Sequence, residues 1–215
     1  MSAIVHIVDD DASFRTSTER LLRASGYAVE TYDSAQQLLT RLPDDPGVSC
    51  ILLDIQMPGI GGPELQNRLN AFGAAPPIIF LTGHADIPTT VHVIKAGADD
   101  LLTKPVEKEI LVGAIERALA RVRALQARHE QLVPLRALLN RLTPRERQVF
   151  ERVARGRMNK EIARELGTTE RTIKAHRHQV MEKMKVASLA ELVIVAERLE
   201  VLAPEAGAAA GENDK

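Results

Sequence analysis

Residues 48–62 read VSCILLDIQMPGIGG, an apolar run that stops on the carboxylate of Asp54 and breaks at Met57-Pro58-Gly59. A run this apolar is typical of a central strand in a parallel sheet, which helices cover on both faces. In open α/β sheets the ligand crevice lies beyond the carboxyl ends of the strands. The stretch therefore predicts a buried strand that delivers an acid to a functional edge.

The rest of the first half alternates between two periods. Short apolar runs are expected to form strands, and each is followed by a stretch with helical spacing; the runs lie at 4–8, 28–32, 48–53, 78–82 and 100–103. This alternation predicts an α/β doubly wound five-stranded parallel sheet.

Polar residues follow four of the predicted strands. They are Asp9-Asp10-Asp11, Asp54, Thr82-Gly83 and Lys104-Pro105. Each alone is typical of a turn or a helix cap. Carboxylates that meet at one edge repel one another, and hard oxygen ligands favour Mg²⁺ as their counter-ion. Because a lysine can hold a phosphate oxygen, this set favours phosphoryl transfer to Asp54 as a nucleophile.

Composition limits the class of protein. Residues 1–120 carry 9 Lys and Arg against 16 Asp and Glu, whereas residues 121–215 carry 19 against 13. A basic half suggests a polyanionic partner, and the acidic half suggests a cation site. The lone Cys50 excludes an internal disulfide, no signal peptide is apparent, and no apolar run approaches ~18 residues. We expect a cytoplasmic protein with no membrane segment.

Helical spacing dominates the second half. A long amphipathic helix is predicted from Glu107, and Pro134 is expected to interrupt it, which favours a linker over a coiled coil. Thr143, Pro144 and Glu146 then form a capping-box start. Two further helices follow, at about 160–166 and 170–183, separated by Gly167. This is a helix-turn-helix pattern.

The predicted second helix of that motif has two faces. Ile173, Val180 and Met184 share one face and are expected in the core; Arg171, Lys174, Ala175 and His178 share another. Lys174, Ala175 and His178 are spaced to meet base edges together. Residues 141–185 hold 13 Lys and Arg against 6 Glu, which suits a phosphate backbone, although a basic helix face is often merely solvated.

Four motifs in the first half resemble the receiver domain of two-component response regulators: IVDDD at 7–11, LLDIQMPGIGG at 52–62, FLTGHAD at 80–86 and DLLTKP at 100–105. The resemblance implies that a sensor histidine kinase phosphorylates Asp54. It also implies a Mg²⁺ site at Asp9, Asp10, Asp54 and the Gln56 carbonyl, phosphoryl contacts from Thr82 and Lys104, and a cis Lys104-Pro105 bond. Asp11 is expected to be solvated. Leu101 replaces the Tyr or Phe usual at that position in receivers, which puts the aromatic switch in doubt.

LTPRERQVF, VARGRMNKEIARELGTTERTIKAHRHQVMEKMKV and SLAELV resemble the LuxR-type DNA-binding domain. The whole resembles a NarL/FixJ-class response regulator, nearest the FixJ branch. The resemblance implies that Lys174, Ala175 and His178 read bases, while Thr169, Arg171 and Arg177 lie nearer phosphates. It further implies promoter DNA and RNA polymerase as partners and a homodimer on phosphorylation. The last helix, 189–199, either forms a dimer surface or completes the monomer core.

These patterns divide the chain into a receiver at 1–120, a helical linker at 121–140, a helix-turn-helix domain at 141–202 and a disordered tail at 203–215. The expected function is a transcriptional regulator, and the family resemblance implies that it is an activator. Three alternatives stay open. They are a receiver whose DNA binding ignores phosphorylation, a phosphatase of the haloacid-dehalogenase style, which lacks that class's DxD pattern here, and a protein-binding scaffold.

Overall fold

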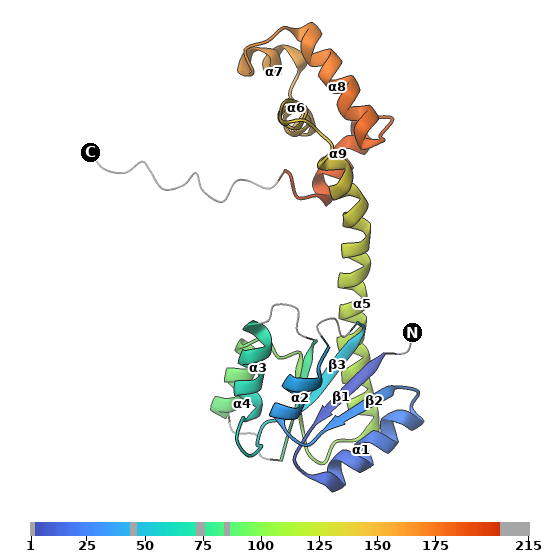
Figure 1. The fold of residues 1–215 in the computed structure, drawn as a ribbon, viewed down its shortest axis with the longest axis vertical. Coiled ribbons are helices and arrows are strands. Elements are labelled where there is room, and N and C mark those ends of the chain that lie inside the picture. Colours follow the sequence, from blue (N-terminus) through green and yellow to red (C-terminus); the bar gives the residue numbers. More distant parts are fainter. Residues whose placement is uncertain (1–2, 44–46, 72–75, 84–86, 203–215) are drawn as a thin grey trace, which may run out of the picture. The chain divides into compact units, whose positions relative to one another are not determined.

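The computed structural model describes residues 3–43, 47–71, 76–83 and 87–202. The first part of the chain forms a parallel sheet in the order β2-β1-β3-β4-β5 (Figure 1). The strands are β1 (Ile4–Val8), β2 (Ala28–Tyr32), β3 (Ser49–Asp54), β4 (Ile78–Thr82) and β5 (Asp100–Thr103). The five predicted strands are confirmed, and β3 extends far enough to include Asp54 itself.

Helices cover both faces of this sheet (Figure 1). On one face α1 (Ala12–Ala24) and α5 (Lys108–Leu139) pack against side chains such as Leu52. On the other face α2 (Ala35–Arg41), α3 (Gly62–Ala71) and α4 (Ile87–Lys95) pack against neighbouring side chains such as Leu53. Successive residues of a strand point to opposite faces, so a strand covered twice must be apolar throughout. The doubly wound architecture is confirmed.

Glycines shape the chain just after β3. Gly59 has a φ of +77°, in the left-handed region that glycine adopts readily, where the apolar run breaks. Gly62 has a different role, because a Cβ there would lie 2.4 Å from the Asp54 carbonyl oxygen and 2.9 Å from the Phe80 ring. Its backbone N–H donates to the Ile55 carbonyl at 3.0 Å. Only glycine lets α3 begin this close to the end of β3, and this contact fixes the loop that follows Asp54.

Pro134 lies inside α5, which runs unbroken from Lys108 to Leu139. The prediction that Pro134 interrupts the helix is therefore wrong. A proline removes one N–H and so leaves the carbonyl of Glu130, four residues earlier, without its helical partner. Both residues are exposed, so that carbonyl lies where solvent can satisfy it. The local sequence carries no sign of that exposure.

The chain divides into two compact units between Gln126 and Ala127. The second contains α6 (Pro144–Ala154), α7 (Asn159–Glu165), α8 (Glu170–Met184) and α9 (Leu189–Arg198). Thr143 and Glu146 form the predicted capping box. Gly156 and Gly167 follow the helix ends with φ values of +78° and +61°. The helices predicted here are confirmed to within a few residues.

The core of the second unit gathers the apolar faces of these helices. It includes the predicted Ile173, Val180 and Met184, together with Leu192 and Ala196 of α9. Those two residues thus belong to the core of this unit, as one of the two expectations for the last helix had it. Leu189 and Ile194, also on α9, are 43% and 48% exposed.

No helix in the described ranges combines the length and apolar character needed to cross a membrane. The predicted tail at 203–215 lies outside the described residues.

Candidate functional site

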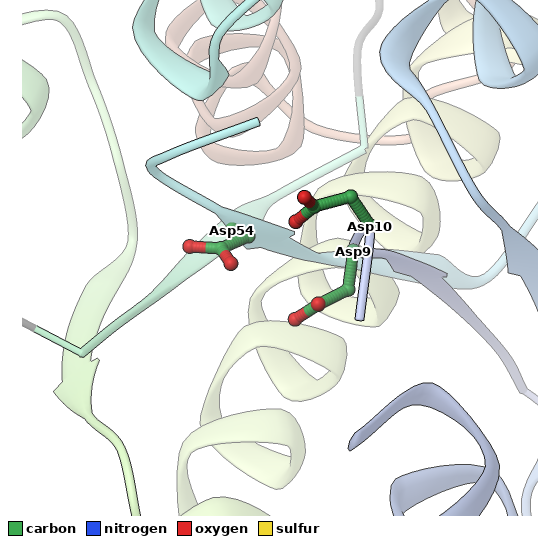
Figure 2. Close-up of side chains that lie close together, drawn as sticks. All are labelled: Asp9, Asp10 and Asp54. Atoms are coloured by element: carbon green, nitrogen blue, oxygen red, sulfur yellow. The ribbon is translucent and has the colours of Figure 1, made fainter. Parts of the chain in front are cut away.

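Three carboxylates meet at the carboxyl edge of the sheet, as Figure 2 shows for Asp9, Asp10 and Asp54. The β1 and β3 strands are neighbours, and the order of strands reverses direction between them. At such a switch point the helices leave to opposite faces and a crevice opens. One carboxylate oxygen from each acid lies within 4.8 Å of the others. The acids predicted at this edge therefore converge.

Lys104 contributes the positive charge of this site. Its Nζ donates to Asp9 Oδ2 at 2.5 Å and to Asp54 Oδ2 at 2.8 Å. The backbone N–H of Lys104 also donates to the Thr82 carbonyl at 2.7 Å, which ties the ends of β5 and β4 together. Lys104 is followed by the cis bond to Pro105 that the resemblance implied. The side chain is only 17% exposed, so its charge acts at close range.

Burial and pairing set the protonation of the site. Burial raises the pKa of the Asp9 carboxyl above its usual range, against the opposing hydrogen bond from Lys104. Burial acts to lower the pKa of Lys104, but the hydrogen bonds to Asp54 and Asp9 outweigh it and leave that pKa raised. Lys104 therefore stays an ammonium at neutral pH. The Lys104 ammonium bonds two of the three acids and leaves Asp10 without a bond from it, so the cluster retains capacity for another cation.

The donor set fits Mg²⁺. All three groups are carboxylates, the hard oxygen ligands that Mg²⁺ prefers. Asp9 is fully buried and Asp54 is 8% exposed, whereas Asp10 is exposed. The cluster therefore opens on one side to solvent, where a magnesium ion can keep the waters it releases reluctantly. The Gln56 backbone N–H donates to Asp54 Oδ1 at 3.2 Å, which holds the Gln56 loop against the site.

Thr82 and Asp11 flank the cluster in different ways. Thr82 is buried at the end of β4, one residue beyond Leu81, which pairs with Asp54. Asp11 is exposed and caps α1, accepting from the backbone N–H of Ser13 at 2.8 Å. Asp11 is therefore outside the converging set, as predicted, and it has the helix-cap role that is typical of a single acid after a strand.

The predicted DNA-contacting residues lie on and before α8. Thr169 is the N-cap of this helix, and its hydroxyl accepts from the Thr172 N–H at 3.2 Å. Five of the six are exposed: Thr169, Arg171, Lys174, Ala175 and His178. Arg177 is half-buried, and its Nη1 donates to Asn159 Oδ1 on α7 at 2.9 Å. A guanidinium has five N–H donors, so this bond leaves others for a phosphate.

Two family models match the chain. Residues 5–116 match the response regulator receiver domain, and residues 140–196 match the bacterial regulatory proteins of the luxR family. The chain is a response regulator of the NarL/FixJ class. Nodulation protein W of Bradyrhizobium diazoefficiens is 41% identical over 202 residues, which cover 94% of this chain and 88% of that protein. The transcriptional regulatory protein FixJ of the same organism is 40% identical over 200 residues, covering 92% and 96%.

Solved structures agree with this assignment. The response regulator StyR matches with a TM-score of 0.78 and 43% identity, covering 92% of this chain and 100% of that chain. Full-length FixJ from B. japonicum matches with a TM-score of 0.57 and 40% identity, covering 93% and 98%. A receiver domain implies a sensor kinase as partner, and a LuxR-type domain implies DNA. Receiver domains in general bind Mg²⁺ at an acidic pocket of the kind found here.

Sequence reasoning missed two residues of this response regulator that contact the site. Both lie in the first turns of α1. The Phe14 ring centroid is 4.2 Å from Lys104 Nζ, and Arg15 Nη1 donates to the Asp9 carbonyl at 2.6 Å. Their position directly after the acidic run was visible. The spacing does not say that Phe14 turns toward a lysine 90 places away or that Arg15 reaches back to the end of β1, so neither contact was predictable.

Leu101 occupies the place where receivers usually carry an aromatic residue. It is half-buried, lies opposite Phe80 in the β4–β5 register and packs against the cluster formed with α2, α3 and α4. An aliphatic side chain in this setting contributes to packing and can change rotamer, but it has no ring to turn inward. The missing aromatic ring in this response regulator therefore affects signal transmission and does not alter the carboxylate site.

Proposed function

We propose that this response regulator accepts a phosphoryl group on Asp54 from a sensor histidine kinase. A bond forms between an Asp54 carboxylate oxygen and phosphorus as the bond from phosphorus to the kinase histidine nitrogen breaks. The proton that the departing imidazole needs is taken up from solvent. The observation that carries the proposal is the convergence of three carboxylates, with the Lys104 ammonium 2.8 Å from Asp54 Oδ2.

The chain's own residues divide the work around the phosphoryl group. Asp9, Asp10, Asp54 and the Gln56 carbonyl would hold Mg²⁺, which when bound neutralises charge on the phosphoryl oxygens. Lys104 would move from its carboxylate pair to one phosphoryl oxygen and act there as a point charge. The Thr82 hydroxyl, at the end of the neighbouring strand, would donate to another. Asp9 is already buried and oriented by its bond from Lys104.

The phosphoryl group would act through the remainder of the chain. In this proposal residues 1–120 are the receiver, 121–140 the helical linker, and 141–202 the unit that binds promoter DNA. Phosphorylation separates the stability of two receiver states, and coupling of this kind typically changes affinity at a second site by about 5- to 150-fold. We infer that it favours a homodimer on DNA and an activating contact with RNA polymerase in the cytoplasm.

DNA recognition is assigned to the exposed face of α8. Lys174, Ala175 and His178 would meet base edges in the major groove. Thr169, Arg171 and Arg177 would contact phosphates. The exposure of the first three residues, set against the buried Ile173 on the opposite face, supports this assignment.

The test compares two aspartate variants. Asp54→Asn should abolish labelling by radiolabelled acetyl phosphate with Mg²⁺, and should abolish the phosphodonor-dependent gain in affinity for operator DNA. Asp33→Asn is the matched control, because Asp33 is an exposed aspartate that follows the edge strand β2 and is outside the cluster. It should behave as the wild type. Equal labelling of the wild type and Asp54→Asn would reject the proposal.

One observation favours a second candidate function. Because Leu101 offers no aromatic ring to couple the site to the surface, the unit at 141–202 could bind DNA regardless of phosphorylation. The same titration separates the two. If the wild type is labelled on Asp54 but its operator affinity does not change, this second function holds and the gate fails.

A further inference from the structure

Phe14 lies beside the ammonium of Lys104. The ring centroid is 4.2 Å from Nζ, whereas Asp9 Oδ2 and Asp54 Oδ2 lie at 2.5 Å and 2.8 Å. A lysine ammonium carries three N–H donors, and the two carboxylates account for two hydrogen bonds. The aromatic ring is the third group that the structure places against this ammonium. A cation within about 6 Å of a ring centroid is attracted by the negative face of the ring.

The backbone of Phe14 is fixed by the acid that does not join the carboxylate cluster. Asp11 caps α1, and its Oδ1 accepts from the Phe14 N–H at 3.2 Å as well as from the Ser13 N–H at 2.8 Å. The Asp11 side chain therefore holds the backbone of the first turn of α1, which includes Phe14. The capped helix start therefore determines where the Phe14 ring lies.

The surroundings of Phe14 explain why a ring matters there. Phe14 is partly buried against the core cluster beneath α1 and α5. It also lines an open groove of about 520 Å³ whose other walls include Thr18, Leu21, Lys104 and Leu111. A smaller side chain would widen this groove beside Lys104 and let more water reach the ammonium. A hydrated lysine spreads over many rotamers, and it then spends less time between the two carboxylates.

We propose that Phe14 is a positioning residue for Lys104, whose aromatic face keeps the ammonium at the carboxylate pair and within reach of the incoming phosphoryl group. The inference rests on the proposed function of Asp54. Phe14 acts through Lys104 and touches neither Mg²⁺ nor the phosphoryl donor. Loss of the ring therefore slows phosphoryl transfer without weakening the binding of Mg²⁺.

The experiment uses the full chain and two substitutions at one position. Phe14→Leu keeps an apolar side chain but removes the aromatic face, and Phe14→Tyr keeps the face. The rate of Asp54 labelling by acetyl phosphate should fall about 3- to 30-fold in Phe14→Leu and stay within about twofold in Phe14→Tyr. Isothermal titration should show that neither substitution weakens Mg²⁺ binding relative to the wild type. Leu21→Val, in the same groove and about two turns further along α1 than Phe14, is the matched control and should label at the wild-type rate.

A spectroscopic signal separates positioning from general packing. The ring should shift the ε-methylene resonances of Lys104 upfield in lysine-labelled protein, with Lys104→Arg used for assignment. This shift should disappear in Phe14→Leu and persist in Phe14→Tyr and Leu21→Val. An unchanged labelling rate, or a Lys104 resonance that does not move in Phe14→Leu, overturns the inference. If the wild type takes no label, the proposed function fails instead, and the Lys104 resonance still decides whether the ring holds the ammonium.

Discussion

Glu146 links the start of α6 to the far end of α8. Its Oε1 and Oε2 accept from Lys183 Nζ at 2.8 Å and 2.7 Å, and Oε2 also accepts from the Thr143 N–H at 2.8 Å. Glu146 is 6% exposed, and the side chain of Lys183 is 28% exposed. Lys183→Met would leave a buried carboxylate with only its backbone partner.

The magnitude follows from these contacts. Removing one partner of a buried ion pair typically costs 3–5 kcal/mol. The remaining Thr143 bond and the partial exposure of Lys183 reduce this, and we expect the free energy of unfolding of the second unit to fall by about 2–3 kcal/mol. In Glu146→Gln the backbone bond can persist and no buried charge is left. That variant should lose about 1 kcal/mol.

Hydrogen exchange on the full chain, followed by mass spectrometry, measures this effect in α6 and α8 directly. The double variant Lys183→Met with Glu146→Gln should recover protection relative to Lys183→Met alone, because no unpaired charge stays buried. Arg147→Met, which breaks an exposed pair with Glu151, is the control and should change stability by less than about 0.5 kcal/mol. Equal losses in Lys183→Met and Arg147→Met would refute the reasoning.

The pH dependence of this contact has a definite sign. Burial acts to raise the pKa of Glu146, but the bonds from Lys183 and Thr143 outweigh it and leave that pKa below its usual value. A lowered folded-state pKa means that the stability is present above the ordinary glutamate pKa, about 4.3, and is lost as the pH falls through the folded-state pKa. Exchange in α6 should therefore accelerate below about pH 4, and this step should be absent in Glu146→Gln.

Three further predictions test the fold, the DNA surface and a buried histidine. Gly62→Ala should lower the melting temperature and slow Asp54 labelling, since its Cβ would meet the Asp54 carbonyl oxygen at 2.4 Å, whereas Gly61→Ala meets nothing closer than 3.6 Å and should be near neutral. In operator titrations Lys174→Ala should cost about 1–3 kcal/mol of sequence discrimination, while Arg171→Ala should weaken all sequences alike and reduce the salt slope by about 1. Burial lowers the pKa of His6, so the unfolded chain takes up a proton before the folded chain does as the pH falls. The free energy of unfolding should therefore decrease below about pH 6.5. His6→Gln should remove this pH dependence in urea titrations, and an unchanged dependence would contradict the assignment.

The fold and the carboxylate cluster were predictable because few arrangements satisfy the pattern. Apolar runs such as 51–53 must be covered on both faces, and parallel strands deliver their carboxyl ends to one edge. Asp9 and Asp54 then meet without any knowledge of side-chain conformation. The capping box at Thr143 was equally readable, because both partners lie within one helical turn.

Contacts that depend on distant side chains were not predictable. Lys183 reaches Glu146 across 37 positions, and neither residue carries a local sign of the other. Arg177 donates to Asn159 for reasons that only the packing of α8 on α7 reveals. Pro134 misled because its effect depends on whether the carbonyl it leaves behind faces solvent. In each case tertiary placement decides between outcomes that the local sequence leaves equal.

The balance of buried charge separates the two roles that carboxylates play in this protein. Asp9, Asp54 and Glu146 are the carboxylates buried among the residues described. Glu146 is matched by a single ammonium and a backbone N–H, so its charge is compensated within the fold. At the sheet edge Lys104 serves two carboxylates at once, with Asp10 close by. An excess of buried negative charge costs stability unless a cation offsets it. The excess at Asp9 and Asp54 therefore suits the sheet edge to binding a cation. The Glu146–Lys183 pair has no such excess and serves the structure of the second unit.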